Sequence, residues 1–226
     1  MPNPDSLRKE VVGENQRRDG FGFLRDTNDQ EDAMSIASRL IDAAEKKLGE
    51  NMDYMRDIAN ASPAAFYKFA LFMLFASHRK AAPVDAQCLA AIGALQHEDC
   101  GPCLQIAVNQ GLAQGVAPEI LSAAIAGGDG LDSEHRLYLD FGRAVSANAP
   151  EAEELRLRVA EKLSKPAMVD LAIAIASARV FPTLKRGLGH AKGCSLVHVR
   201  VPGEEEGSTD FADSHGLRKA HSAKSA

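Results

Sequence analysis

The chain has 226 residues, of which 45% are hydrophobic, 5% are aromatic and none is tryptophan. Its 26 Lys and Arg against 31 Asp and Glu give a formal net charge of −5, so the overall composition supplies no basic footprint of the kind that binds a nucleic-acid backbone. A chain of this length buries roughly 70% of its unfolded surface and needs neither disulfides nor metals to form a core. We expect one ordinary globular domain without a nucleic-acid partner.

The two ends of the chain differ in composition from its middle. Residues 1–31 are rich in charge and glycine, which predicts a mobile N-terminal arm, and residues 1–20 contain no apolar stretch of a signal peptide. Residues 202–226 are polar, which predicts a disordered C-terminal tail. Residues 32–201 then form the single folded domain. Four cysteines are too few for a disulfide scaffold, so we expect the protein in the reducing cytoplasm.

Between these ends, apolar residues recur with helical spacing behind serine and proline start signals. About eight helices are expected: at 33–48, from Ser62-Pro63, from Pro83, from Cys100-Gly101-Pro102-Cys103, from Pro118, at 137–145, after Pro150, and from Ser164-Lys165-Pro166. The second is apolar on all sides, as in a core or a subunit interface, and is too short to cross a membrane. Pro182 is expected to kink or end the last helix. Only 196–201 alternates like a strand, so the predicted fold class is all-α with no substantial sheet.

One motif carries chemistry, the tetrapeptide Cys100-Gly101-Pro102-Cys103. Proline is favoured at the start of a helix, so Cys103 should lie in the first turn, where unpaired amides and the helix dipole stabilise a thiolate. Cys100 is the natural partner with which Cys103 can close a disulfide and open it again. We therefore expect a redox-active dithiol.

Other interpretations of this cysteine pair remain open. The pair could be half of a zinc site completed by Cys88, His97, or His190 with Cys194, although the chain has no second Cys-x-x-Cys motif. It could also consist of inert core thiols. A thioredoxin active site uses the same tetrapeptide but needs a strand before it, and residues 90–99 have a helical pattern. No motif for a cofactor is present, so neither a cofactor nor a metal is expected.

The order of these elements resembles the all-α family of carboxymuconolactone decarboxylases and alkyl hydroperoxidase D-like proteins. The resemblance covers about residues 60–195 and rests on four features: the helix opened by Ser62-Pro63, the proline-initiated helix before the dithiol, the passage 100–107, and the later helices with residues 131–138 and 163–171. It implies an alkyl hydroperoxidase D-like helical bundle. In the peroxidase branch the second cysteine attacks the peroxide and the first resolves it, which implies these roles for Cys103 and Cys100.

The resemblance also implies partners, and it breaks down at two positions. It implies a hydroperoxide or disulfide substrate, a dithiol reductant protein such as a lipoyl domain, and a homo-oligomer, either a trimer or a hexamer. Where the peroxidases of that family have a histidine and a glutamate as a proton relay, this chain has Ala107 and Cys88. Cys88 would then be either a third thiol facing the dithiol or a small core residue.

Other polar residues near the motif are candidates for the missing relay. His97, Glu98 and Asp99 could replace it, or they are solvated loop charges. Arg179, Lys185 and Arg186 could hold an anionic group, or they lie on the solvated surface.

The sequence as a whole favours a thiol-disulfide oxidoreductase, with hydroperoxide reduction as its peroxidase activity. Two alternatives remain open. One is a member of the family that lacks the relay and acts as a redox-responsive or structural helical oligomer. The other is a decarboxylase-like enzyme on the same scaffold, although such an enzyme has no use for a dithiol.

Overall fold

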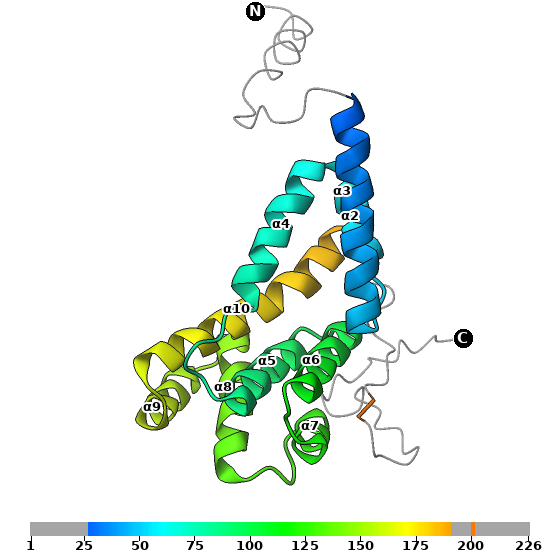
Figure 1. The fold of residues 1–226 in the computed structure, drawn as a ribbon. Coiled ribbons are helices and arrows are strands. Elements are labelled where there is room, and N and C mark those ends of the chain that lie inside the picture. Colours follow the sequence, from blue (N-terminus) through cyan, green and yellow to red (C-terminus); the bar gives the residue numbers. More distant parts are fainter. Residues whose placement is uncertain (1–26, 191–199, 202–226) are drawn as a thin grey trace, which may run out of the picture.

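The computed structural model describes residues 27–190, 200 and 201, and this part of the chain is all-α (Figure 1). Its helices are α2 (Thr27–Leu48), α3 (Asp53–Ala61), α4 (Pro63–Ala76), α5 (Val84–His97), α6 (Gly101–Ala113), α7 (Pro118–Ile125), α8 (Ser133–Ala147), α9 (Ala152–Lys162) and α10 (Lys165–Gly187). No strand occurs among the described residues, which confirms the predicted fold class. Most of the strand-like passage 196–201 lies outside the described residues.

The start signals in the sequence act as expected. The hydroxyl of Ser62 accepts a hydrogen bond from the Ala65 amide at the start of α4, and Ser164 does the same at the start of α10. The Asp132 carboxylate accepts hydrogen bonds from two amides in the first turn of α8. These caps satisfy backbone donors that have no partner inside the helix, and they fix where each helix begins.

The helices form two hydrophobic clusters. The larger one is centred on α5 and α8 and contains Leu89 and Leu139, and the smaller one joins α2, α3 and the start of α4 around Ile41 and Phe66. In Figure 1, α2–α4 stand together above α5–α9, and α10 runs from one group to the other. Residues of α10 pack against both clusters, so this helix connects them.

Two glycines allow α5 and α8 to cross in close contact. A β-carbon on Gly142 of α8 would overlap the carbonyl oxygen of Ala90, and one on Gly93 of α5 would overlap that of Leu139. Only glycine fits at such a crossing, because a larger residue would force the two helices apart. The close packing at the centre of the larger cluster therefore depends on glycine at positions 93 and 142.

Several helices differ from the sequence-based expectations. α3 was not among the expected helices, and α2 begins at Thr27, inside the stretch assigned to the mobile arm. α10 does not end at Pro182 but continues to Gly187, because Pro182 is fully buried and packing outweighs the lost backbone hydrogen bond. The rest of the arm and the tail lie outside the described residues.

Two helices, α4 and α10, are rich in apolar residues. α4 buries Phe66 but leaves Leu71, Leu74 and Phe75 exposed by 66%, 69% and 52%. α10 is long and apolar enough to cross a bilayer by those two criteria alone. In the fold, however, it lies against α5, α4 and α8.

Candidate functional site

The dithiol lies at the start of α6, where the sequence predicted it. Cys100 is the residue before the helix and Cys103 lies in its first turn, behind Gly101 and Pro102. The two sulfur atoms are 2.6 Å apart, and the residues are only 3% and 6% exposed. The pair is therefore shielded from bulk water, with its sulfur atoms in contact.

Two opposing sets of groups act on the Cys100 thiol. Its hydrogen bond with Cys103 and its burial raise its pKa, while the Cys103 backbone amide and the Lys185 ammonium group act in the opposite direction. The Cys100 thiol therefore keeps its proton at neutral pH and can donate a hydrogen bond to the neighbouring sulfur.

A buried lysine and a buried tyrosine lie next to the dithiol. Lys185 of α10 is 5% exposed, and its Nζ lies 5.0 Å from the centre of the Tyr54 ring. Burial raises the pKa of the Tyr54 hydroxyl, and the electrostatic effect of the neighbouring Cys103 and Cys100 raises it further. Tyr54 is therefore a neutral phenol, and Lys185 provides positive charge within electrostatic range of the sulfur atoms.

Cys103 opens into a pocket of about 690 Å³, which we call the dithiol pocket, whereas Cys100 does not line it. Its walls come from α2, α3, α4, α5, α6 and α10. Most lining side chains are aliphatic or aromatic, and the volume falls within the range of small-molecule sites. Of the two cysteines, Cys103 is therefore the one that a molecule in this pocket would meet.

Cys88 of α5 faces α6 about one helical turn beyond Cys103. Its sulfur is 3.9 Å from the Ala107 carbonyl oxygen, and Ala107 is one helical turn beyond Cys103. It also packs against the larger hydrophobic cluster. Burial, together with the nearby Asp85, raises the pKa of its thiol to about 12. Cys88 is also only partly buried and lines the same pocket as Cys103, so both interpretations drawn from the sequence stay open.

Glu98, two residues before the motif, forms an ion pair with two arginines of α10. The Glu98 carboxylate is buried and bonded to the guanidinium groups of Arg179, at 2.7 Å, and of Arg186. Burial alone would raise its pKa, but the two arginines hold it below its usual value. Glu98 is therefore neither a solvated loop charge nor a free base. Lys185, which neighbours Arg186, is buried, so the interpretation that it lies on the solvated surface is wrong.

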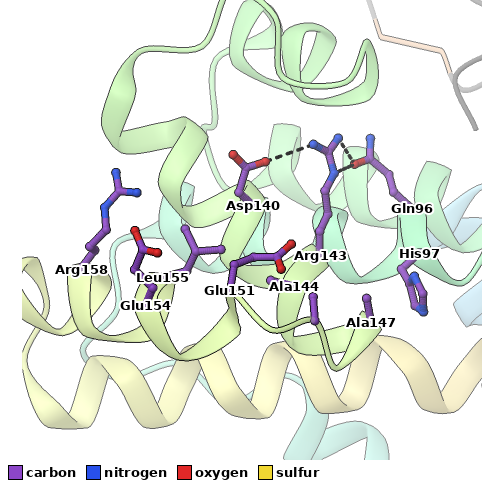
Figure 2. A pocket seen from close by; sticks show the side chains of 11 residues that line it. Gln96, His97, Asp140, Arg143, Ala144, Ala147, Glu151, Glu154, Leu155 and Arg158 are labelled. Atoms are coloured by element: carbon purple, nitrogen blue, oxygen red, sulfur yellow. Dashed lines mark hydrogen bonds and ion pairs between the residues drawn. The ribbon is translucent and has the colours of Figure 1, made fainter.

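His97 belongs to a different part of the surface. It lines a second pocket of about 500 Å³ that shares no lining residue with the dithiol pocket. Figure 2 shows Arg143 of this second pocket pointing at Gln96, with Asp140 beside it. Arg143 bonds to the Gln96 side-chain oxygen at 2.6 and 2.9 Å and to the Asp140 carboxylate at 3.2 Å. These three side chains bond to one another, and the lining of this pocket contains no cysteine, serine or threonine.

A buried carboxylate fixes the loop between α4 and α5, which borders the dithiol pocket. One oxygen of Asp170 accepts hydrogen bonds from the backbone amides of Lys80, Ala81 and Ala82 at 2.9, 2.7 and 2.9 Å. Burial opposes the charge, yet these bonds and the nearby His78 give Asp170 a lowered pKa. The loop is therefore tied to α10 at one end of the pocket.

The zinc interpretation receives no support from the described part of the chain. No three His, Cys, Asp or Glu residues gather there as a metal site would require. His190 bonds to Asp57 at 2.6 Å, and Cys194 lies outside the described residues.

Comparisons with known proteins leave the family open. No protein-family model matches the chain, and neither a curated protein nor a solved structure matches it. The resemblance to the alkyl hydroperoxidase D-like family therefore stays a prediction from the residues.

Sequence reasoning located the two cysteines and named Lys185 as a possible anion-binding residue, but it missed Tyr54 and Ser177. Tyr54 lies in the unexpected helix α3, and Ser177 and Lys185 lie on α10. All three line the dithiol pocket. Lys185 and Ser177 are eight residues apart on one face of α10. This spacing alone does not predict that they line the pocket, because that depends on how α10 packs against the other helices.

Proposed function

We propose that the protein is a thiol-disulfide oxidoreductase that reduces hydroperoxides, with Cys103 as the nucleophile and Cys100 as the resolving thiol. The observation that carries the proposal is the difference between the two cysteines. Cys103 lines the dithiol pocket. Cys100 does not line the pocket, but its sulfur lies 2.6 Å from the sulfur of Cys103. A substrate in the pocket thus reaches Cys103, while Cys100 lies close enough to form a disulfide with it.

The reaction has two steps on the protein. The Cys103 thiolate attacks the outer oxygen of a hydroperoxide, the O–O bond breaks, and the alkoxide leaves and takes up a proton to become an alcohol. The Cys100 thiol then attacks the Cys103 sulfenic acid, which forms the disulfide and releases water. A dithiol reductant returns both cysteines to thiols. Overall, one hydroperoxide and two thiols give one alcohol, one water and one disulfide.

Three features support thiolate chemistry without the histidine and glutamate relay. Cys103 lies in the first turn of α6, where the helix dipole favours negative charge. The Lys185 ammonium group of α10 acts electrostatically on Cys100, whose sulfur lies 2.6 Å from that of Cys103. The site is also largely shielded from water, which strengthens both effects. Water in the pocket then delivers the proton that the leaving alkoxide needs.

The deciding experiment measures consumption of cumene hydroperoxide by the purified protein with dithiothreitol as reductant. We expect turnover in the wild type and in Cys88→Ser, and none in Cys103→Ser. Without reductant, peroxide-treated Cys100→Ser should accumulate the Cys103 sulfenic acid, which mass spectrometry detects. Turnover that persists in Cys103→Ser contradicts the assignment. If the wild type does not form the Cys100–Cys103 disulfide at all, the proposed redox function fails.

We also propose that the chain acts as a homo-oligomer in a reducing, cytoplasmic setting. The support for oligomerisation is the exposed apolar surface of α4 at Leu71, Leu74 and Phe75. Size-exclusion chromatography with light scattering tests it. A trimer or hexamer is expected for the wild type, and Leu74→Glu should shift it toward the monomer.

A further inference from the structure

Tyr54 brings a phenol hydroxyl from helix α3 to the dithiol pocket. The residue is 4% exposed, and it lines the pocket together with Cys103. Cys103 and Cys100 both act electrostatically on its hydroxyl, which places this group within electrostatic range of the two sulfur atoms. A substrate that reaches Cys103 through the pocket therefore enters the space that Tyr54 borders.

This hydroxyl has no hydrogen-bond partner in the part of the chain that the structure describes. The hydroxyls that are sealed from solvent there without a partner are those of Ser146 and Ser177. The Tyr54 hydroxyl is not one of these, so it keeps contact with the space of the pocket. A donor in such a place gains free energy when an oxygen atom of a bound molecule accepts its hydrogen bond.

The surroundings of Tyr54 keep the proton on its oxygen until a strong base arrives. Burial and the two neighbouring cysteines raise its pKa, so the resting residue is a protonated donor. The buried Lys185 ammonium group lies 5.0 Å from the centre of the Tyr54 ring. A cation in this position attracts the negative charge that appears on Tyr54 when its proton leaves.

The peroxide step of the proposed reaction requires a proton donor. When the Cys103 thiolate attacks the outer oxygen of an alkyl hydroperoxide, the inner oxygen leaves as an alkoxide. An alkoxide is about as basic as hydroxide, whose conjugate acid, water, has a pKa of about 15.7, so it leaves readily only when a proton reaches it. Even with its raised pKa, Tyr54 remains a stronger acid than the alcohol that forms.

Other groups near the dithiol are less suited to this role. The Glu98 carboxylate is held by two arginines, and His97 lines the second pocket. The Cys88 thiol lines the dithiol pocket, but it donates to the Ala107 carbonyl oxygen at 3.9 Å. Tyr54 borders the same pocket as Cys103 with a hydroxyl that is unpaired among the described residues.

We propose that Tyr54 is the proton donor of the peroxide step, a further catalytic residue that acts beside Cys103. The proposal rests on the proposed function, because it concerns the same reaction. As the S–O bond forms and the O–O bond breaks, the Tyr54 hydroxyl gives its proton to the leaving oxygen. The Cys103 sulfur is oxidised to the sulfenic acid, and the peroxide is reduced to the alcohol. Pocket water then returns to Tyr54 the proton that Cys103 released when it ionised, so water remains the final source of this proton.

The test compares two oxidants whose leaving groups differ in basicity. Cumene hydroperoxide releases an alkoxide, whereas peroxyacetic acid releases a carboxylate, which has a pKa of about 4 and leaves without a proton. Single-turnover oxidation of the reduced, full-length protein is followed at neutral pH, and the rate in Cys103→Ser is subtracted. Tyr54→Phe should slow oxidation by cumene hydroperoxide at least about tenfold and change oxidation by peroxyacetic acid by less than about twofold.

Three features of the variants make the comparison specific. Tyr54→Phe removes the hydroxyl but keeps the ring beside Lys185, so the fold and the charge near the dithiol should be retained, which thermal unfolding checks. Tyr67→Phe is the matched control, because Tyr67 packs against the smaller cluster without lining the pocket. It should leave both rates unchanged. Cys88→Ser should also leave both rates unchanged.

The possible outcomes separate this inference from the proposed function. An equal loss with both oxidants in Tyr54→Phe, or no loss with cumene hydroperoxide, would overturn the role of Tyr54 and leave the proposed function standing. A loss confined to cumene hydroperoxide in Cys88→Ser would assign the proton to Cys88 and also overturn it. Oxidation that is as fast in Cys103→Ser as in the wild type would refute the proposed function, and this inference with it.

Discussion

Asp170 of α10 accepts a hydrogen bond of 2.7 Å from the backbone amide of Ala81, which precedes it by 89 residues. The same oxygen also accepts bonds from the amides on either side of Ala81. A helix and a distant loop are therefore joined through one buried charge. Because that loop borders the dithiol pocket, the stability of the pocket wall depends on the ionisation of Asp170.

The first prediction concerns the removal of that charge. Asp170→Asn should lower the free energy of unfolding by about 3 kcal/mol, because three amides lose a charged acceptor in a buried site. Urea denaturation measures the change. Asp129→Asn is the control, since the Asp129 side chain is 96% exposed, and it should change stability by less than about 0.5 kcal/mol. Similar effects of the two substitutions would contradict this role of Asp170.

The second prediction is the pH dependence of the same contact. The pKa of Asp170 is lowered in the folded protein, so its stabilisation is complete above the unfolded value, near pH 4, and is lost as the pH falls through the folded value. The stability difference between the wild type and Asp170→Asn should therefore shrink as the pH is lowered from neutral toward about 3. Urea unfolding at a series of pH values measures this difference. A difference that stays constant over that range would show that the Asp170 charge is not responsible.

The third prediction concerns the crossing of α5 and α8. Gly142→Ala should destabilise the protein by at least about 2 kcal/mol, because the added methyl group would overlap the Ala90 carbonyl. Gly187→Ala is the matched control. No atom lies within 4 Å of the β-carbon that it adds, so it should be neutral or stabilise by up to about 1 kcal/mol. Thermal unfolding of both variants decides the matter, and tolerance of alanine at position 142 would refute the close crossing.

The fourth prediction concerns the reactivity of Cys88. Its pKa of about 12 means that the reactive thiolate is scarce at pH 8. In a variant with Cys100, Cys103 and Cys194 replaced by serine, alkylation by iodoacetamide should be at least about 100-fold slower than for a free cysteine. The rate should still be rising at pH 10. A plateau near pH 9 would mean that the thiol is not buried as described.

The elements that could be predicted from the sequence are those with local signals. Ser62-Pro63 and Ser164-Lys165-Pro166 predicted the starts of α4 and α10, because capping and proline geometry depend only on neighbouring residues. Cys100 and Cys103 were likewise recognisable from their spacing. α3 was not predicted, because it has only nine residues and begins after Met52, whose side chain makes no capping hydrogen bond.

The environment of the dithiol could not be predicted in the same way. Glu98 and Arg179 are 81 residues apart, and no local pattern indicates that they pair. Lys185 follows a proline that was expected to kink or end its helix, so its burial depends on tertiary packing around Pro182. The dithiol pocket needs six helices at once. Such features arise only when distant segments are assembled.

The presence of two hydrophobic clusters has a consequence for the motions of the molecule. Each cluster can lose its packing as a separate cooperative unit, with its own rate of amide hydrogen exchange. The dithiol pocket is lined from both sides, by Met52 and Tyr54 of the smaller cluster and by Leu95 and Cys103 of the larger one. A molecule bound in it touches both units and slows their separation. We therefore expect a molecule bound in the pocket to slow amide exchange in α2 and α3, the helices of the smaller cluster, although the dithiol itself belongs to the larger one.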